Sequence, residues 1–366
     1  MNVPILRPAE WVLPGHPDKL ADAVADALVQ AAFERQPEAL CAIEVAVHRQ
    51  AVYLTGRLAC NGSTEIDIAS LVRGVYESAG YGRDWRPAPA DVTIGGNLCI
   101  ETLVPGEEII RHISDDQSIV TGYAIDLPGI GFIPPEQWLA RELAKRLFAL
   151  VDSPLRLCPD GKVLVVVEED SERRRLKAVS CSLLAQGGDI ELQRAVVQAV
   201  EQVVRDIAAR VPGFDASMPE DVTVNGSGTF SMGGPEGDNG LSGKKLLLDH
   251  YGPRVPIGGT ALSGKDFWKP DRAGTLLARR LALAVVRAGV APEATVQFLT
   301  FPGDEAPRHV RISAAGAELP EARRWLDLMD CRFCVAAAWS GGSDLAQRAR
   351  WGWFGLSAPW EALALA

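Results

Sequence analysis

Residues 41–56 read CAIEVAVHRQAVYLTG, two apolar runs separated by a short polar turn. This pattern predicts two strands, Cys41 to His48 and Ala51 to Gly56, joined as a hairpin. Before the hairpin, apolar residues from Pro17 to about Arg35 recur at helical spacing, and a proline suits the first helical turn. A second helix is predicted after the hairpin, near Ile66 to Ser78. The order predicted for this segment is therefore helix, hairpin, helix.

The same order of elements returns twice further along the chain. Helix, strand, strand and helix are predicted at 136–150, 162–167, 176–184 and 191–209, and again at 271–288, 294–300, 309–313 and 319–328. This repetition predicts an α+β fold of three similar units about a pseudo-threefold axis, each a sheet with helices on one face. The free face of each sheet then needs cover from another domain or another subunit. We expect the domains to span 3–100, 112–231 and 233–362.

Length and composition limit the class of protein. With 366 residues, 47% hydrophobic and 23% charged, the chain is typical of a soluble protein of two or three domains. It contains no run of 18 apolar residues and no secretory apolar core at its start, so we expect a cytoplasmic protein without a membrane span. A net charge of −10 argues against nucleic-acid binding. The odd number of cysteines, seven, argues against a disulfide framework, and Cys331 and Cys334 are expected to be a buried pair of thiols.

Two glycine–lysine loops indicate a phosphate site. Residues 258–266 read GGTALSGKD and fit the pattern G-x-x-x-x-G-K, but Asp266 stands where Ser or Thr normally binds magnesium. Because a carboxylate at this position would face a nucleotide's phosphates, the segment is not expected to be a standard NTPase loop. A second loop, GLSGKK at 240–245, repeats the same motif upstream. With the nearby aspartates, the loops predict a polyphosphate held by several lysines and magnesium; the alternative is two surface turns with solvated lysines.

Three motifs resemble those of one enzyme family. GHPDK at 15–19, GGPEGDNGLSGKK at 233–245 and GGTALSGKDFWKPD at 258–271 are similar to motifs of S-adenosylmethionine synthetase (methionine adenosyltransferase), and the resemblance runs from about Glu10 to Trp360. It implies that methionine sulfur attacks C5′ of ATP and expels triphosphate, which is cleaved to pyrophosphate and phosphate. It also implies a homodimer or a dimer of dimers with active sites at the subunit interface. A thioether carries no proton, so this chemistry needs positioning and charge stabilisation rather than a general base.

The resemblance assigns roles residue by residue. His16 is expected beside O5′ of ATP, where it stabilises the departing oxygen; without the motif it would be read as a helix cap. The implied catalytic residues are His16, Lys162, Lys244 and Lys265. The implied ATP-binding residues are these four with Asp160, Phe230, Asp238, Lys245 and Ala261. Those implied to bind the acceptor are Asn97, Asp116, Asp238 and Lys269. Asp18 and Asp271 are implied to bind two Mg²⁺ ions and Glu44 a K⁺ ion; otherwise each aspartate is a helix N-terminal charge.

The acceptor half departs from the family pattern. The family carries a strand glutamate that binds the methionine ammonium, and here Leu58 stands at or next to that position, while Arg57 would repel an ammonium. Asp115, next to Asp116, can supply a relocated carboxylate. Methionine is the expected acceptor, with another thioether or a different acceptor as the alternative. A nucleotide-binding regulatory homologue and a plain triphosphate hydrolase are further alternatives, although a hydrolase would not need Phe230 as an adenine platform.

Overall fold

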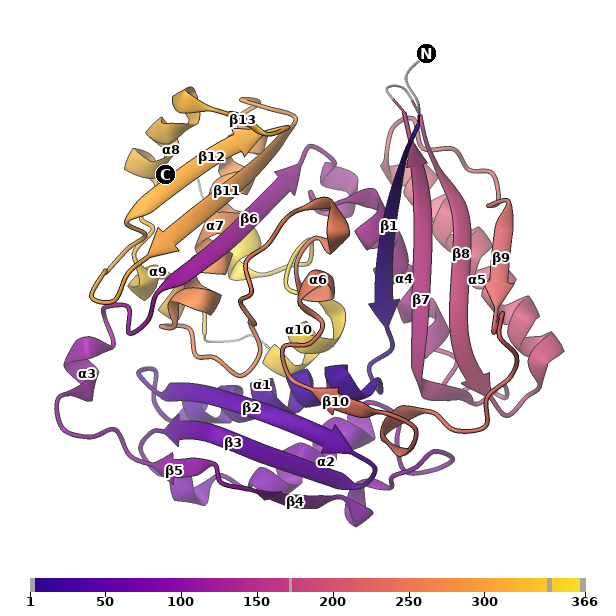
Figure 1. Ribbon diagram of the computed structural model, residues 1–366, viewed down its shortest axis with the longest axis horizontal. Coiled ribbons are helices and arrows are strands. Elements are labelled where there is room, and N and C mark those ends of the chain that lie inside the picture. Colours follow the sequence, from indigo (N-terminus) through magenta and orange to yellow (C-terminus); the bar gives the residue numbers. More distant parts are fainter. Residues whose placement is uncertain (1–3, 171–172, 341–343, 363–366) are drawn as a thin grey trace.

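The computed structural model describes residues 4–170, 173–340 and 344–362; Val3, the predicted start of the N-terminal domain, lies outside the described residues. The described chain forms three sheets, arranged as the sides of a triangle, with helices packed on one face of each (Figure 1). The prediction of an α+β fold with three similar units is confirmed.

The first sheet has the order β10-β2-β3-β4, and β5 also pairs with β3. Its centre is the predicted hairpin, in which Ala42 lies opposite Arg57 and Glu44 opposite Thr55. Alternate residues of β2, such as Ile43, are buried against the helices, while Glu44 is exposed on the other face. The elements of this unit are α1 (Pro17–Arg35), β2 (Leu40–His48), β3 (Ala51–Ala59), α2 (Ile68–Ser78), β4 (Thr93–Gly96), β5 (Cys99–Glu101) and α3 (Glu107–Ile110).

The second sheet has the order β1-β7-β8-β9. Its helices are α4 and α5, which carry apolar residues at helical spacing on the face turned to the sheet. The predicted strands are longer in the structure, because the hairpin continues beyond the apolar run into the charged residues that end it. The elements are β1 (Ile5–Val12), α4 (Pro135–Phe148), β7 (Leu157–Glu169), β8 (Arg174–Ala185), α5 (Asp189–Arg210) and β9 (Asp221–Val224).

The third sheet has the order β13-β12-β11-β6 and packs against α7. One prediction is corrected here: a single helix was expected over 319–328, but the segment is a 3₁₀ turn at Pro320–Arg323 followed by the short helix α8. A 3₁₀ turn is frequent where a helix begins. The elements are β6 (Ser118–Ile125), β10 (Asn239–Leu241), α6 (Leu246–Asp249), α7 (Pro270–Arg287), β11 (Glu293–Thr300), β12 (His309–Ala314), β13 (Ala317–Glu318), α8 (Arg324–Leu328), α9 (Phe333–Ala337) and α10 (Leu345–Trp351).

The three sheets exchange strands in a ring. The strand β1 precedes α1 in sequence but pairs with β7 of the second sheet, and β6 precedes α4 but pairs with β11 of the third. The strand β10 precedes α7 and pairs with β2 of the first sheet. Each sheet therefore contains a strand from another part of the chain (Figure 1). The contiguous domain boundaries remain a prediction.

Two expectations about composition can be compared with the structure. All seven cysteines are free, and Cys331 and Cys334 are half-buried, so the expected buried pair is only partly shielded from solvent. Of the helices in the described ranges, none is both long and apolar enough to span a bilayer.

Candidate active site

The turn at residues 15–19 is packed against the beginning of β7. The backbone N–H of Gly15 donates to the carbonyl of Pro159 at 3.0 Å. A Cβ atom at Gly15 would lie only 2.4 Å from the Cβ atom of Pro159, so this approach requires a glycine. The carbonyl of Gly15 also accepts a hydrogen bond from the Tyr81 hydroxyl. The packing brings His16, which follows Gly15, close to Lys162 on β7.

His16 caps the N-terminus of α1 and is almost fully buried. Its Nδ1 accepts a hydrogen bond of 3.1 Å from the backbone N–H of Asp18. Burial, followed by the charges of nearby lysines, of which Lys245 and Lys162 are the strongest, lowers the pKa of His16 to about 2. The ring is therefore neutral at physiological pH, and because Nδ1 is an acceptor, its proton is on Nε2. His16 can donate a hydrogen bond to a ligand but brings no positive charge.

Asp18 is the second residue of the same helix and lies among lysines. Its Oδ1 accepts the backbone N–H of Leu241 at 3.1 Å. The Nζ atoms of Lys244 and Lys245 lie 3.7 and 3.8 Å from its carboxylate oxygens. Asp18 is 2% exposed whereas Lys244 is half exposed, so the lysine can move toward a ligand. Together they form a positively charged cluster around one buried carboxylate.

The predicted nucleoside contacts lie beside this cluster. Asp160 Oδ2 accepts the backbone N–H of Gly234 at 2.8 Å, and its buried Oδ1 has no hydrogen-bond partner among the described residues. Burial raises the pKa of Asp160. An unpartnered buried acceptor is suited to a donor group of a ligand. Phe230 is half-buried and Asp238 is exposed on the adjoining loop. We call the eight residues here the first cluster: His16, Asp18, Asp160, Lys162, Phe230, Asp238, Lys244 and Lys245.

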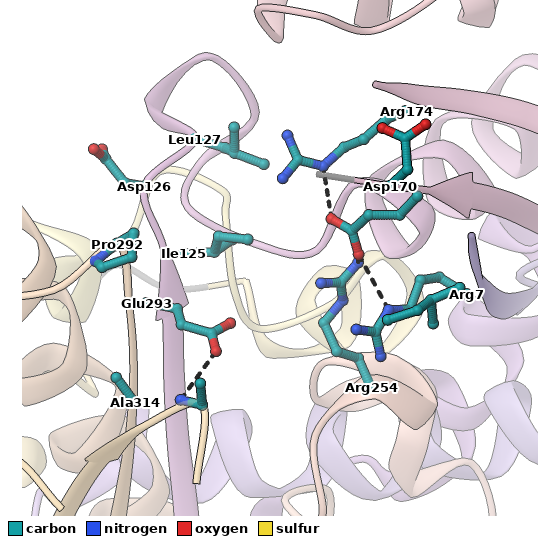
Figure 2. Close-up of a pocket in the computed structure, with 13 residues that line it drawn as sticks. Arg7, Ile125, Asp126, Leu127, Asp170, Arg174, Arg254, Pro292, Glu293 and Ala314 are labelled. Carbon is teal, nitrogen blue, oxygen red and sulfur yellow. Dashed lines mark hydrogen bonds and ion pairs between the residues drawn. The ribbon is translucent and has the colours of Figure 1, made fainter. Parts of the chain in front are cut away.

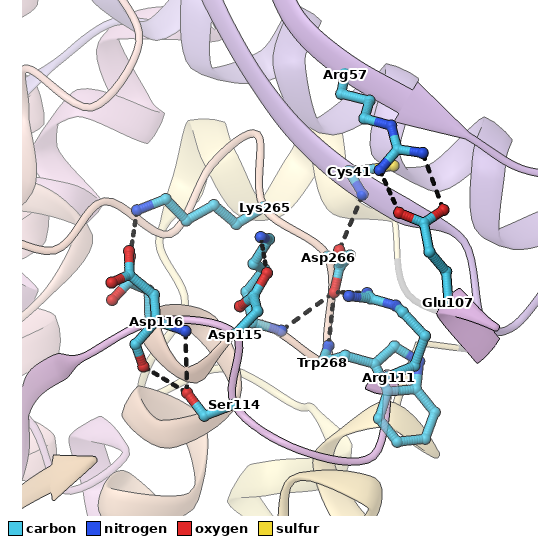
Figure 3. Close-up of polar contacts among 12 residues, drawn as sticks. Cys41, Arg57, Glu107, Arg111, Ser114, Asp115, Asp116, Lys265, Asp266 and Trp268 are labelled. Atoms are coloured by element: carbon cyan, nitrogen blue, oxygen red, sulfur yellow. Dashed lines mark hydrogen bonds and ion pairs between the residues drawn. The ribbon is translucent and has the colours of Figure 1, made fainter. Parts of the chain in front are cut away.

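The remaining predicted site residues lie around the glycine–lysine loop at residues 258–266. The Lys265 ammonium pairs with the carboxylate of Asp271, which also faces the Thr260 hydroxyl at 3.5 Å. Lys269, the N-cap of α7, pairs with Asp115 (Figure 3). Asp116 is exposed next to Asp115, and Ala261 lies half-buried in the loop. We call this the second cluster: Asp115, Asp116, Ala261, Lys265, Lys269 and Asp271.

Asp266 occupies the position at which a standard NTPase loop has Ser or Thr. Its carboxylate is fully buried and accepts the backbone N–H groups of Cys41 at 2.9 Å and Trp268 at 2.8 Å. The guanidinium of Arg111 completes its partners at 2.5 Å, and Lys265 extends away from it (Figure 3). A carboxylate so well supplied with donors is stable inside the protein and does not face phosphates. Asp266 holds the loop in place instead of binding the ligand.

The structure shows which of Arg57 and Leu58 lies on the open face of the first sheet. Leu58 is 0% exposed and points to the helix side of the first sheet. Successive side chains of a strand alternate, so Arg57 occupies the open face that Glu44 shares. The guanidinium binds both carboxylate oxygens of Glu107 on α3 (Figure 3). It also binds one carboxylate oxygen of Glu101 on β5. The residue that a ligand on this face would meet is Arg57, already paired with two carboxylates.

Within one chain, the described residues of the two clusters are not paired with each other directly. Among the residues that the structure describes, no hydrogen bond or ion pair joins a member of the first cluster to a member of the second. Glu44 and Asn97 belong to neither cluster. Glu44 accepts the Ser242 hydroxyl on the open face of β2, and Asn97 is exposed, with its backbone N–H bonded to Leu54. The structure thus groups most of the predicted residues into two clusters that are not directly paired with each other, although Ala261 lies against Gly243, next to Lys244.

Comparison with known proteins decides the family. The family model "S-adenosylmethionine synthetase, N-terminal domain" matches residues 5–104, and the corresponding C-terminal domain model matches residues 232–337. The chain is 32% identical to the S-adenosylmethionine synthase of Petrotoga mobilis over 336 residues, which covers 85% of this chain and 82% of the relative. The chain belongs to the S-adenosylmethionine synthetase family. It is also 33% identical to the synthase of Thermus thermophilus, over 84% of this chain and 81% of the relative. With S-adenosylmethionine synthase 1 of Frankia casuarinae it shares 33% identity over 96% and 95%.

This member of the S-adenosylmethionine synthetase family offers carboxylates that suit magnesium, but no closed metal cage. In the described part of the chain, no group of three or more His, Cys, Asp or Glu side chains is arranged to hold a metal. Mg²⁺ is usually bound by one or two carboxylates together with substrate phosphates and water. Asp18 and Asp271 each provide one carboxylate beside lysines, which fits an ion that arrives with a polyphosphate.

An open cavity of about 910 Å³ lies elsewhere in this S-adenosylmethionine synthetase family member (Figure 2). Arg7, Arg174 and Arg254 on one wall all bind the carboxylate of Glu169. The opposite wall includes Leu127 and other residues of the β6 and β11 ends. None of the predicted site residues lines this cavity. Its size alone therefore does not identify the site that the motifs indicate.

Sequence reasoning missed two aspartates that support the loops of this synthetase family member. Asp22 and Asp26 on α1 are fully buried, and each accepts a hydrogen bond from a glycine of a lysine loop. The regular four-residue spacing of Asp18, Asp22 and Asp26 was the available signal, because it places all three carboxylates on one helix face.

Proposed function

We propose that the protein is an S-adenosylmethionine synthetase that joins ATP and methionine and releases phosphate and pyrophosphate through tripolyphosphate. The observation that carries this proposal is the first cluster, where a neutral histidine lies among lysines and beside an unpartnered buried carboxylate oxygen. Such a site suits a nucleoside with a polyanionic leaving group. The family membership supports the same reaction.

The residues on the page have distinct tasks in this reaction. The Nε2–H of His16 donates to the oxygen that leaves C5′, and this donor requires no change in protonation. Lys162, Lys244 and Lys245 stabilise the charge that builds on the triphosphate. Asp160 and Phe230 orient the nucleoside, so that the sulfur of the acceptor attacks in line. The thioether has no proton to lose, so no general base is needed.

Asp18 and Asp271 are the residues that would hold Mg²⁺. When bound, the ion neutralises charge on phosphate oxygens and orients them. Two ions, one for each aspartate, agree with the two lysine loops. Glu44, exposed on β2, is the proposed ligand for K⁺.

We also propose that two chains complete each site. The first cluster of one subunit would face the second cluster of its partner, so a homodimer would contain two sites. The support is the lack of direct pairing between the described residues of the two clusters within one chain and the open face of each sheet (Figure 1). A dimer of dimers would keep the same paired sites.

Two residues, Arg57 and Asp115, favour different acceptors. Arg57 occupies the open face where the family has an ammonium-binding glutamate, which favours a second candidate: the same chemistry on a thioether without an α-amino group. Asp115 supports methionine instead, because its carboxylate lies beside Lys269 at the second cluster. An acceptor ammonium that displaced Lys269 could form an ion pair with this carboxylate.

One experiment separates these candidates. The protein is incubated with ATP, Mg²⁺ and a panel of thioethers that includes methionine and its analogue lacking the amino group, and adenosylated products are detected by mass spectrometry. Formation of S-adenosylmethionine with phosphate and pyrophosphate supports methionine as the acceptor. A faster reaction with the deaminated analogue supports the second candidate. Hydrolysis of ATP without any adenosylated product would contradict both.

A further inference from the structure

One face of α1 carries three buried carboxylates, four residues apart. Asp18, Asp22 and Asp26 are 2%, 0% and 0% exposed. Residues at this spacing lie in one row along a helix. Each carboxylate accepts a backbone N–H from a loop distant in sequence: Leu241 at 3.1 Å, Gly243 at 2.8 Å and Gly264 at 3.0 Å, respectively. The row therefore contacts both glycine–lysine loops.

Asp22 uses both of its oxygens. Oδ1 accepts the backbone N–H of Gly243, directly before Lys244, and Oδ2 accepts the Lys19 ammonium at 3.0 Å. Lys19 is fully buried and also pairs with Asp249 on α6. The row therefore connects α1 to the segment after the loop at residues 240–245. Gly243 has a φ of 72°, a conformation that glycine adopts readily. The hydrogen bond to Asp22 thus holds this turn on the α1 side, while Ser242 is bonded to Val45 of β2.

Asp26 uses only one oxygen. Oδ1 accepts both the backbone N–H of Gly264 and the guanidinium of Arg272, whereas the buried Oδ2 has no hydrogen-bond partner in the described ranges. Arg272 also donates to the carbonyl of Leu262 at 2.9 Å and stacks over Trp353. The carboxylate and the guanidinium therefore hold residues 262–264 on both sides, directly before Lys265.

We propose that Asp22 and Asp26 are positioning residues that set the two lysine loops in the geometry that binds polyphosphate. They do not touch the ligand themselves. A backbone N–H that loses its buried acceptor must find another, so the loop that carries it moves. This inference rests on the proposed function, because it assumes that the lysines of the loops bind phosphates.

The test measures the affinities of the full-length protein for inorganic tripolyphosphate with Mg²⁺ and for adenosine, by isothermal titration calorimetry. Asp22→Asn must place an NH₂ group against Gly243 or against Lys19, so we expect at least about tenfold weaker tripolyphosphate binding. Asp26→Leu is expected to have a similar effect. Asp26→Asn can keep its oxygen toward Gly264 and place its NH₂ group at the unpartnered position. It should therefore bind tripolyphosphate at least about threefold more tightly than Asp26→Leu does. Adenosine affinity should stay unchanged throughout.

Glu34→Gln, an exposed carboxylate of the same helix, is the matched control and should bind both ligands as the wild type does. A general loss of folding would weaken adenosine and tripolyphosphate together, which would contradict a positioning role. Should Asp26→Leu fail to fold, Asp22→Asn still decides, since wild-type tripolyphosphate affinity in that variant would overturn the proposal. Failure of the wild type to bind tripolyphosphate would instead overturn the proposed function.

Discussion

The neutral state of His16 leads to a measurable loss of stability in mild acid. The folded protein lowers the pKa of this imidazole from 6.5 to about 2, mainly by burial. The unfolded chain therefore takes up a proton below pH 6.5 that the folded chain rejects, and stability falls as the pH decreases from 6.5 toward 2. At about pH 5 the linkage amounts to about 2 kcal/mol. His250, buried with a pKa lowered to about 4, acts in the same direction.

The assay compares urea unfolding at neutral pH and at about pH 5 for the wild type and His16→Gln. The variant should lose about 2 kcal/mol less on acidification, because glutamine takes up no proton. His309→Gln, which removes an exposed imidazole, controls for the loss of a histidine. In parallel, ¹³Cε1-labelled histidine is followed by NMR, and the His16 signal is assigned from the variant. A His16 signal that titrates near pH 6.5 would refute the neutral hydrogen-bond donor proposed for the leaving group.

Four further outcomes follow from the structure. Lys265→Ala and His16→Ala should each lower turnover by at least roughly a hundredfold, as removal of a preorganised charge stabiliser does; turnover within about threefold of the wild type would exclude that residue from the chemistry. Mixing and reassociating these two inactive variants should restore activity to about a quarter of the sites, because one site of each mixed dimer is intact; light scattering that shows an active 39.3 kDa monomer would contradict the shared site. Asp115→Asn should raise the apparent KM for methionine more than that for ATP, and an unchanged methionine KM rules out the relocated anchor. Leu58→Ala should cost about 2–5 kcal/mol of stability with little change in the methionine KM, whereas Arg57→Ala should change that KM; the reverse pattern would place Leu58 in the pocket.

Much of the fold could be predicted because its signals are local. The apolar spacing after Pro17 gives α1 with both ends as predicted, and the alternation in residues 41–56 gives the first hairpin. The same alternation contained a further signal, since Val52 and Leu54 on the inner face place Leu58 inside as well. The strand partners could not be read in this way, because β1 pairs with β7 across more than a hundred residues of intervening chain.

The site was predicted from family motifs rather than from a physical pattern. Several features of the site were not contained in these motifs. The motif gives the identity of Asp266 but not its direction, which depends on Arg111 and on the backbone of Cys41. The sequence signal of Asp22 and Asp26 is their four-residue spacing after Asp18, which does not show a role because a carboxylate on a helix is usually solvated. Their burial and the loops that reach them show the role. In the proposed dimer the two clusters would meet across the subunit boundary, which one sequence does not show.

The ring of exchanged strands has a consequence for the order of events during synthesis. The hairpin of β2 and β3 leaves the ribosome early, yet its neighbour β10 ends at Leu241, so one edge of the first sheet stays open until two thirds of the chain has been made. In the second sheet β1, an edge strand, can pair much sooner, because its partner β7 ends at Glu169, although β9 follows only at Asp221–Val224. An open edge can pair with another nascent chain. The first sheet is thus exposed to misassembly while translation continues, as is β6, whose partner β11 is made later still. A slow passage through residues 170–238 would prolong the exposure of the first sheet.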